Sequence, residues 1–176
     1  MTRRCLLLLS TTIGLSGCKG STPAARPLAD VVAAPADSMR GVVQRIGAEP
    51  QTQLTARGAD GATCVLRFPA AIPGIEGLEV TLWGARATGV QPAAGGATCA
   101  LTVTRYAVRA VDGVPAVDGI LLLSETSYAL DLAGGARPQV WNVPPTLKAQ
   151  VGARIFWAGP LDRAPVAYGV LEPARR

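Results

Sequence analysis

Hydrophobic and polar positions alternate along much of this chain, in short runs. Leu78, Val80 and Leu82 share one face of residues 78–83, and residues 99–104 repeat the pattern. A period of two is typical of half-buried strands. Helical periodicity is not found after residue 17, so we predict an all-β fold. The first group of predicted strands comprises residues 41–43, 51–56, 63–68, 78–83 and 99–108, with turns at 59–62 and 93–96.

The same order of glycine and apolar positions occurs twice. The segment that begins at Gly77 runs glycine, two residues, Val or Ile, one residue, Leu or Trp, one residue, glycine. The segment that begins at Gly152, 75 positions later, has the same form. This constant offset predicts an internal repeat. The alternative is that small β proteins share such glycine and apolar positions by chance. The second group of predicted strands comprises residues 119–122, 128–132, 140–144, 153–158 and 166–170.

Five short strands per copy, with the longer link between the third and fourth, resemble the OB-fold. The resemblance implies two tandem OB-like barrels, at residues 39–109 and 119–173, with a linker at 110–118. In that fold the third and fifth strands run parallel as neighbours. Cys64 and Cys99 lie near the starts of these two strands, so the two cysteines would be side by side. The links at 69–76 and 144–150 are too short for the helix that many OB-folds carry there. An immunoglobulin-like sandwich is the alternative, because Cys64, Trp83 and Cys99 match its Cys–Trp–Cys order. However, Ala97 stands two residues before Cys99, where that fold has a tyrosine.

The start of the chain has the three parts of a secretory signal. Arg3 and Arg4 precede an apolar stretch at residues 5–15, which is shorter than the ~20 residues of a membrane-spanning helix. Residues 15–18, Leu-Ser-Gly-Cys, then resemble the lipobox of bacterial lipoproteins. The resemblance implies a signal peptide at 1–17, cleavage after Gly17, and diacylglycerol on Cys18 with further acylation of its amino group. The alternative is an ordinary signal peptide cut beside a cysteine.

A lipidated Cys18 would anchor the protein to the membrane of the cell envelope, because two or more acyl chains hold firmly. Lys19 follows it. In lipoproteins of two-membrane bacteria an aspartate there tends to favour the inner membrane, so the resemblance favours the outer membrane, facing the periplasm. Residues 18–38 are rich in Ser, Thr, Pro and Ala and predict a flexible linker.

The four cysteines then divide into two groups. Cys5 leaves with the signal and Cys18 carries lipid, which leaves Cys64 and Cys99 in an oxidising compartment. We therefore expect a disulfide between them, worth roughly 3–4 kcal/mol for a loop of this length. No metal site or other cofactor is expected, since the sequence has no histidine and no C-x-x-C motif.

Charge and side-chain chemistry argue against catalysis and against nucleic acid. The formal charge of +5 includes Arg3 and Arg4, and their loss leaves 15 basic against 12 acidic residues. The basic residues are scattered rather than clustered. Without histidine, Ser-His-Asp and Cys-His arrangements are excluded. The hydroxyls and the acid of residues 124–127 fall at a predicted turn. We therefore predict that the protein is not an enzyme.

Aromatic residues supply the candidate binding positions. Trp141 follows Val140, and Trp157 follows Phe156, so one member of each pair should face outward. A surface tryptophan stacks on sugars or docks a protein; alternatively, these two seal the junction between the barrels.

The function we expect is a non-catalytic binding or scaffolding module with an envelope protein as partner, or alternatively recognition of an envelope glycan. The aromatics expected in the core are Phe68, Trp83, Tyr106 and Phe156.

Overall fold

The computed structural model describes residues 37–50, 52–93 and 96–174, which belong to one compact unit. The predicted signal peptide, Cys18 and most of the predicted linker at 18–38 lie outside these residues. The described part is all-β, as the alternating pattern predicts, and its strands pair almost entirely antiparallel.

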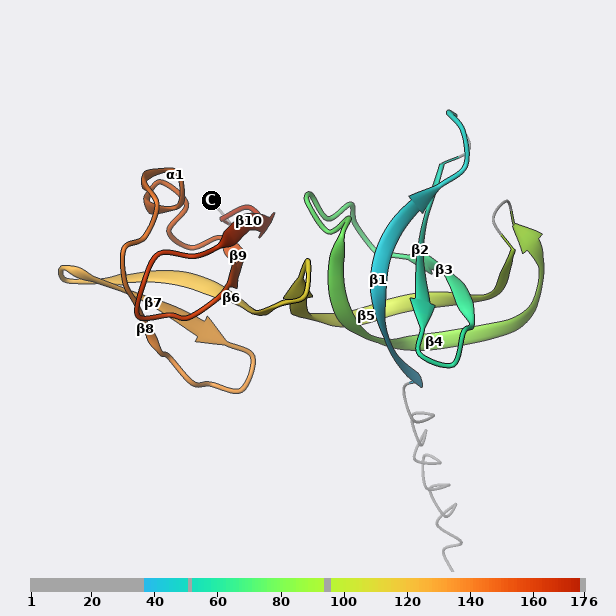
Figure 1. Ribbon diagram of the computed structural model, residues 1–176, viewed down its shortest axis with the longest axis horizontal. Coiled ribbons are helices and arrows are strands. Elements are labelled where there is room, and N and C mark those ends of the chain that lie inside the picture. Colours follow the sequence, from blue (N-terminus) through green and yellow to red (C-terminus); the bar gives the residue numbers. More distant parts are fainter. Residues whose placement is uncertain (1–36, 51, 94–95, 175–176) are drawn as a thin grey trace, which may run out of the picture. The chain divides into compact units, whose positions relative to one another are not determined.

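The first five strands form a cycle of hydrogen-bonded pairs (Figure 1). β1 pairs with β2 and with β4, and β2 pairs with β3. β3 pairs in parallel with β5, and β5 pairs with β4, so the pairings return to β1. The strands are β1 (Asp37–Ile46), β2 (Gln53–Gly58), β3 (Thr63–Arg67), β4 (Leu78–Ala93) and β5 (Ala97–Val111).

The second five strands pair in the same order but leave one pair unmade. β6 pairs with β7 and β9, β7 pairs with β8, and β9 pairs with β10. Among the described residues β8 and β10 do not pair with each other, although they occupy the places of β3 and β5 in this order. The strands are β6 (Val114–Ser124), β7 (Ser127–Leu132), β8 (Gln139–Val140), β9 (Arg154–Ala158) and β10 (Ala167–Glu172).

Two connecting segments differ from the sequence-based expectation, and the strand expected at 140–144 is reduced to β8 at Gln139–Val140. Residues 110–118, which we expected to be a linker, lie in β5, in β6 and in the turn between them, where Asp112 and Gly113 have positive φ. The link at 144–150 contains a helix after all, α1 (Pro145–Lys148), which is a single turn. Pro145 can begin it because a proline needs no hydrogen-bond acceptor in the first turn. Four residues are too few to give a visible helical period.

Two glycines allow strands to approach closely. A Cβ on Gly41 in β1 would lie 2.2 Å from the carbonyl oxygen of Arg57 in β2. A Cβ on Gly119 in β6 would lie 2.7 Å from the carbonyl oxygen of Asp131 in β7. Each glycine sits where its strand is paired on both sides, so the backbone crowds there. Only glycine fits at these two positions.

The core forms two apolar clusters. The first gathers the inward side chains of β1 to β5 and continues into the second group of strands through Ala116, Phe156, Ala158 and Leu171. The second gathers Trp157, Ile155 and other residues of β6 to β9 with Leu147 of α1. Phe156 and Trp157 are neighbours on β9, so this strand contributes one large side chain to each cluster.

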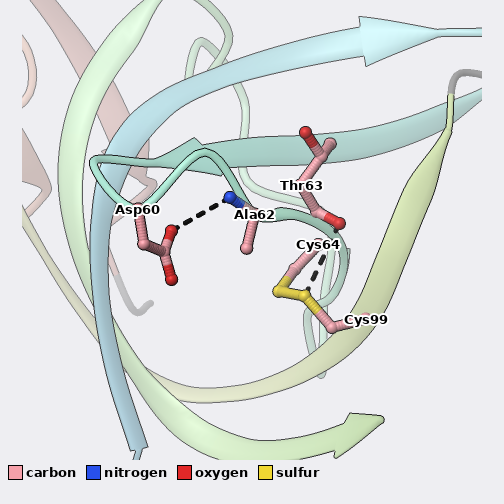
Figure 2. Close-up of a disulfide and its surroundings, with 5 residues drawn as sticks. All are labelled: Asp60, Ala62, Thr63, Cys64 and Cys99. Carbon is pink, nitrogen blue, oxygen red and sulfur yellow. Dashed lines mark hydrogen bonds between the residues drawn. A yellow bond between two sulfur atoms is a disulfide. The ribbon is translucent and has the colours of Figure 1, made fainter. Parts of the chain in front are cut away.

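The expected disulfide is present, between Cys64 in β3 and Cys99 in β5 (Figure 2). The parallel register places these residues opposite each other, with their Cα atoms 4.5 Å apart. Both are buried, and the carbonyl oxygen of Thr63 lies 3.5 Å from Cys99 Sγ. Beside them Asp60 Oδ1 accepts a hydrogen bond of 3.0 Å from the Ala62 amide, which closes the turn between β2 and β3.

Candidate functional site

A depression of about 690 Å³ opens on β2 and β3. Thr55 pairs with Val65, so the beginning of β2 lies beside the end of β3. The chain that leaves β3 at Phe68 then borders the depression through residues 69–72. The lining residues are Thr52, Gln53, Leu54, Val65, Leu66, Arg67, Phe68, Pro69, Ala70, Ala71, Ile72 and Ala100.

The lining combines an apolar floor with a polar rim. Leu54, Phe68 and Ile72 are partly buried and pack against the first core cluster. Gln53 and Arg67 are exposed, so an amide and a guanidinium stand at the edge. A few polar groups around an apolar surface are typical of a site that binds by packing and orients its ligand by hydrogen bonds. The arrangement therefore suits binding.

The two candidate tryptophans have opposite environments. Trp141 directly follows β8 and is 54% exposed, while its backbone amide donates to the carbonyl of Leu161. Trp157 is fully buried, and its Nε1 donates a hydrogen bond of 3.1 Å to the Pro160 carbonyl. The expectation of a surface role for Trp157 is therefore wrong, because Phe156 and Trp157 are both buried, each in its own cluster. Phe156, rather than either tryptophan, joins the first cluster.

The aromatics expected in the core are there with one exception. Tyr106 and Phe156 are buried, and Phe68 is partly buried against the first cluster. Trp83 lies on the opposite face of β4 from the buried Leu82, and the guanidinium of Arg105 stacks 4.1 Å from its ring centroid. Our placement of Trp83 in the core is thus wrong: the alternation of β4 sends even positions inward and Trp83 outward.

A polar cluster that the sequence analysis did not identify joins β5 to β6, β9 and β10. Arg154 donates to Asp118 Oδ2 through Nε (2.9 Å) and Nη2 (2.6 Å) and to Glu172 Oε1 through Nη1 (2.9 Å). Its guanidinium carbon also lies 4.0 Å from the ring centroid of Tyr106, whose backbone carbonyl accepts from Nη2. Asp118 Oδ1 accepts from the Val108 amide at 2.7 Å. In the sequence Arg154 is one arginine among scattered ones, so only the fold reveals these partners.

This environment shifts two pKa values. Burial raises the pKa of Tyr106, and the hydrogen bond that its hydroxyl donates to Glu172 adds to the effect, against the opposing charge of Arg154. Burial lowers the pKa of Arg154, but the charge of Asp118 and the hydrogen bonds to it outweigh burial, so the net pKa is raised. The cluster therefore holds a neutral phenol beside a permanently charged guanidinium, which suits a structural lock between the two groups of strands.

No group of three or more potential metal ligands occurs in residues 37–50, 52–93 and 96–174. Over the same ranges, no helix has the length and apolar character to cross a membrane. Comparisons with protein-family models, with curated proteins and with solved structures find no match to this chain.

Proposed function

We propose that this protein is an exported lipoprotein, anchored to the cell-envelope membrane through Cys18, whose body is a non-catalytic binding or scaffolding module. The lipobox-like residues 15–18 support the anchor. The observation that carries the proposal is the buried Cys64–Cys99 disulfide, because structural disulfides persist in oxidising compartments outside the cytoplasm. Lys19 in place of aspartate favours the outer membrane.

We also infer that the two groups of strands are OB-like barrels, the first closed and the second open. The cyclic pairing of β1 to β5, with its parallel β3–β5 pair, supports the first. The same pairing order in β6 to β10 supports the second. Its β8 has only two residues, which is too short to pair along β10.

The depression on β2 and β3 is the binding surface of this proposal. OB-folds bind extended ligands on the face of their second and third strands. The apolar floor at Leu54 and Phe68 and the polar rim at Gln53 and Arg67 match the chemistry of an extended polypeptide segment of an envelope protein.

Two measurements test the anchor and the surface separately. Mass spectrometry of the protein from its own envelope should find an amino-terminal Cys18 carrying acyl chains. A free amino terminus at another residue, or an uncleaved chain in the soluble fraction, would refute the anchor. A photo-crosslinking residue at Gln53 should capture one discrete envelope partner. The matched position is Arg163, which is exposed and outside the depression; equal capture at both positions would refute the surface.

Glycan recognition is the second candidate function, and the exposure of Trp141 favours it. An indole that is 54% exposed can stack on a sugar ring. Titration with envelope glycan fragments should then change tryptophan fluorescence in the native chain and not in Trp141→Ala. Trp157 is buried, so its emission should not respond to the glycan and serves as an internal reference. An unchanged spectrum in the native chain would exclude this candidate.

A further inference from the structure

One outer face of the first five strands gathers arginines around a tryptophan. We define the arginine face as Arg40 of β1, Arg57 of β2, Trp83 of β4, and Arg105 and Arg109 of β5. Residues opposite each other in an antiparallel pair point to the same side of a sheet. The register pairs Trp83 with Arg105 and with Ser38, and Arg40 with Thr81. It also pairs Arg57 with Val42, which lies two positions from Arg40 and so on the same side of β1. Arg109 joins this row because its Nε donates to Thr81 Oγ1 at 2.9 Å.

The arginine face carries an excess of positive charge. All four arginines are exposed. Glu79, the acid on the same face, accepts from Arg40 Nε at 2.7 Å and so offsets one of the four charges. Asp60 lies in the turn after β2, where its Oδ1 is bound to the Ala62 amide. Arg57, Arg105 and Arg109 therefore present their charge outward.

The face also lies where the proposed tether enters the body. β1 begins at Asp37, and the next residue, Ser38, is opposite Trp83. Residues 19–36 separate this point from Cys18. Eighteen residues span at most about 60 Å when fully extended, so the membrane stays within reach of the row that contains Trp83 and Arg105.

We propose that the arginine face rests on the anionic phospholipid surface of the membrane that holds the lipidated cysteine. Guanidinium groups bind lipid phosphates in a bidentate fashion, and a tryptophan flanked by cations is the side chain that favours the membrane interface. Arg105 is stacked on Trp83, so the guanidinium and the indole are presented together at one position. The tether supplies high local concentration, so weak contacts are sufficient. This inference rests on the proposed anchor for its setting, but the surface itself is testable without lipidation.

The test uses the full chain with Cys18→Ser, so that every protein compared lacks lipid and shares the same amino-terminal segment. Binding is measured by sedimentation with vesicles of phosphatidylglycerol and phosphatidylcholine, and with vesicles of phosphatidylcholine alone. The ratio of the two isolates the electrostatic contribution to binding. Arg3 and Arg4 of the amino-terminal segment add to this ratio equally in every variant, so differences between variants report the folded part. Each arginine near an anionic surface contributes about a fivefold gain in binding, so R105Q/R109Q should reduce the ratio about 25-fold.

The matched control is R137Q/R163Q, which removes the same charge from exposed arginines of the other group of strands. It should reduce the ratio far less, because contacts at the surface decay within a Debye length of about 8–10 Å. Equal losses in the two double variants would overturn the proposal, since net charge alone would then explain binding. A native ratio near one, or tighter retention by single-stranded nucleic acid than by anionic vesicles, would overturn it as well.

A second measurement does not depend on removing arginines. Brominated phosphatidylglycerol should quench the fluorescence of the bound native chain and of Trp141→Phe, but much less that of Trp83→Phe. Quenching that disappears with Trp141 instead would place a different face on the membrane and overturn the proposal. Failure of the anchor would appear separately, as an unmodified Cys18 in the envelope-derived protein, whatever the vesicles show.

Discussion

Replacement of Arg154 by methionine is the sharpest test of how the two groups of strands are held together. Methionine keeps most of the volume and removes the charge. Asp118 would then keep its hydrogen bond from the Val108 amide but lose its cation. Its side chain is only 6% exposed, so little solvent is available to replace the guanidinium.

The size of the effect follows from this burial. Removing one partner of a buried ion pair costs about 3–5 kcal/mol, because the remaining charge is left without compensation. Glu172 contributes little to this figure, since its side chain is 46% exposed and solvent screens it. Glu172→Gln should therefore cost no more than about 1 kcal/mol. Asp118→Asn combined with Arg154→Met should recover part of the loss, with a coupling energy of about 1–3 kcal/mol.

Urea denaturation at neutral pH measures the free energies of unfolding of the native chain and of four variants, the fourth being Asp118→Asn alone, which the coupling energy requires. The slope of the transition should stay constant, so that the midpoint reports stability. A loss below about 1 kcal/mol for Arg154→Met would refute the reasoning, because a buried carboxylate without a compensating charge destabilises the folded state by more than that. Equal losses for Arg154→Met and Glu172→Gln would refute it too, since burial would then not distinguish the partners.

Three further predictions concern the disulfide, a glycine and a tyrosine. Replacing Cys64 and Cys99 together by alanine should cost about 4 kcal/mol in the chain-entropy model, seen as a lower urea midpoint, and reduction of the native protein should match it. Gly41→Ala should lower the melting temperature strongly because its Cβ would strike a carbonyl, whereas Gly134→Ala, with open space around its Cβ, should not. Because the folded-state pKa of Tyr106 is raised, its neutral phenol favours folding below about pH 10, and stability should fall at higher pH by up to about 1.4 kcal/mol per pH unit. Tyr106→Phe should lack this part of the decline; parallel curves for the two proteins would contradict the assignment.

The strands of this protein depend on local sequence, which is why the alternation of apolar and polar residues located them. β4 alternates buried and part-exposed residues from Leu78 to Gly84, and β5 follows the same rule from Val103 onward with one irregularity. The disulfide was predictable because it needed only the number of cysteines and the oxidising compartment expected from the signal-like residues. Strand ends were less predictable: β1 begins at Asp37, before its apolar residues, because pairing with β4 extends it.

The site was predicted less well than the strands. Trp83 follows the alternation of β4 and faces outward, so its expected core position went against its own strand pattern. Trp157 is different, since two adjacent large residues on β9 are both buried, each in its own apolar cluster. A pattern of period two cannot express that, because it assigns one face to the core and the other to solvent. The depression on β2 and β3 combines residues 52–54, 65–72 and Ala100, which are neighbours only after folding.

Local sequence was sufficient to predict the all-β class, the cysteine pair and most strand positions, because each depends on residues close along the chain or on simple counting. Which strands close a cycle of pairs and which stay open became clear only from the folded arrangement. This arrangement also decided the partners of Arg154, which come from three other strands. Such contacts depend on register and twist across strands far apart in the sequence, and no local pattern encodes the distance between two side chains that meet across a sheet.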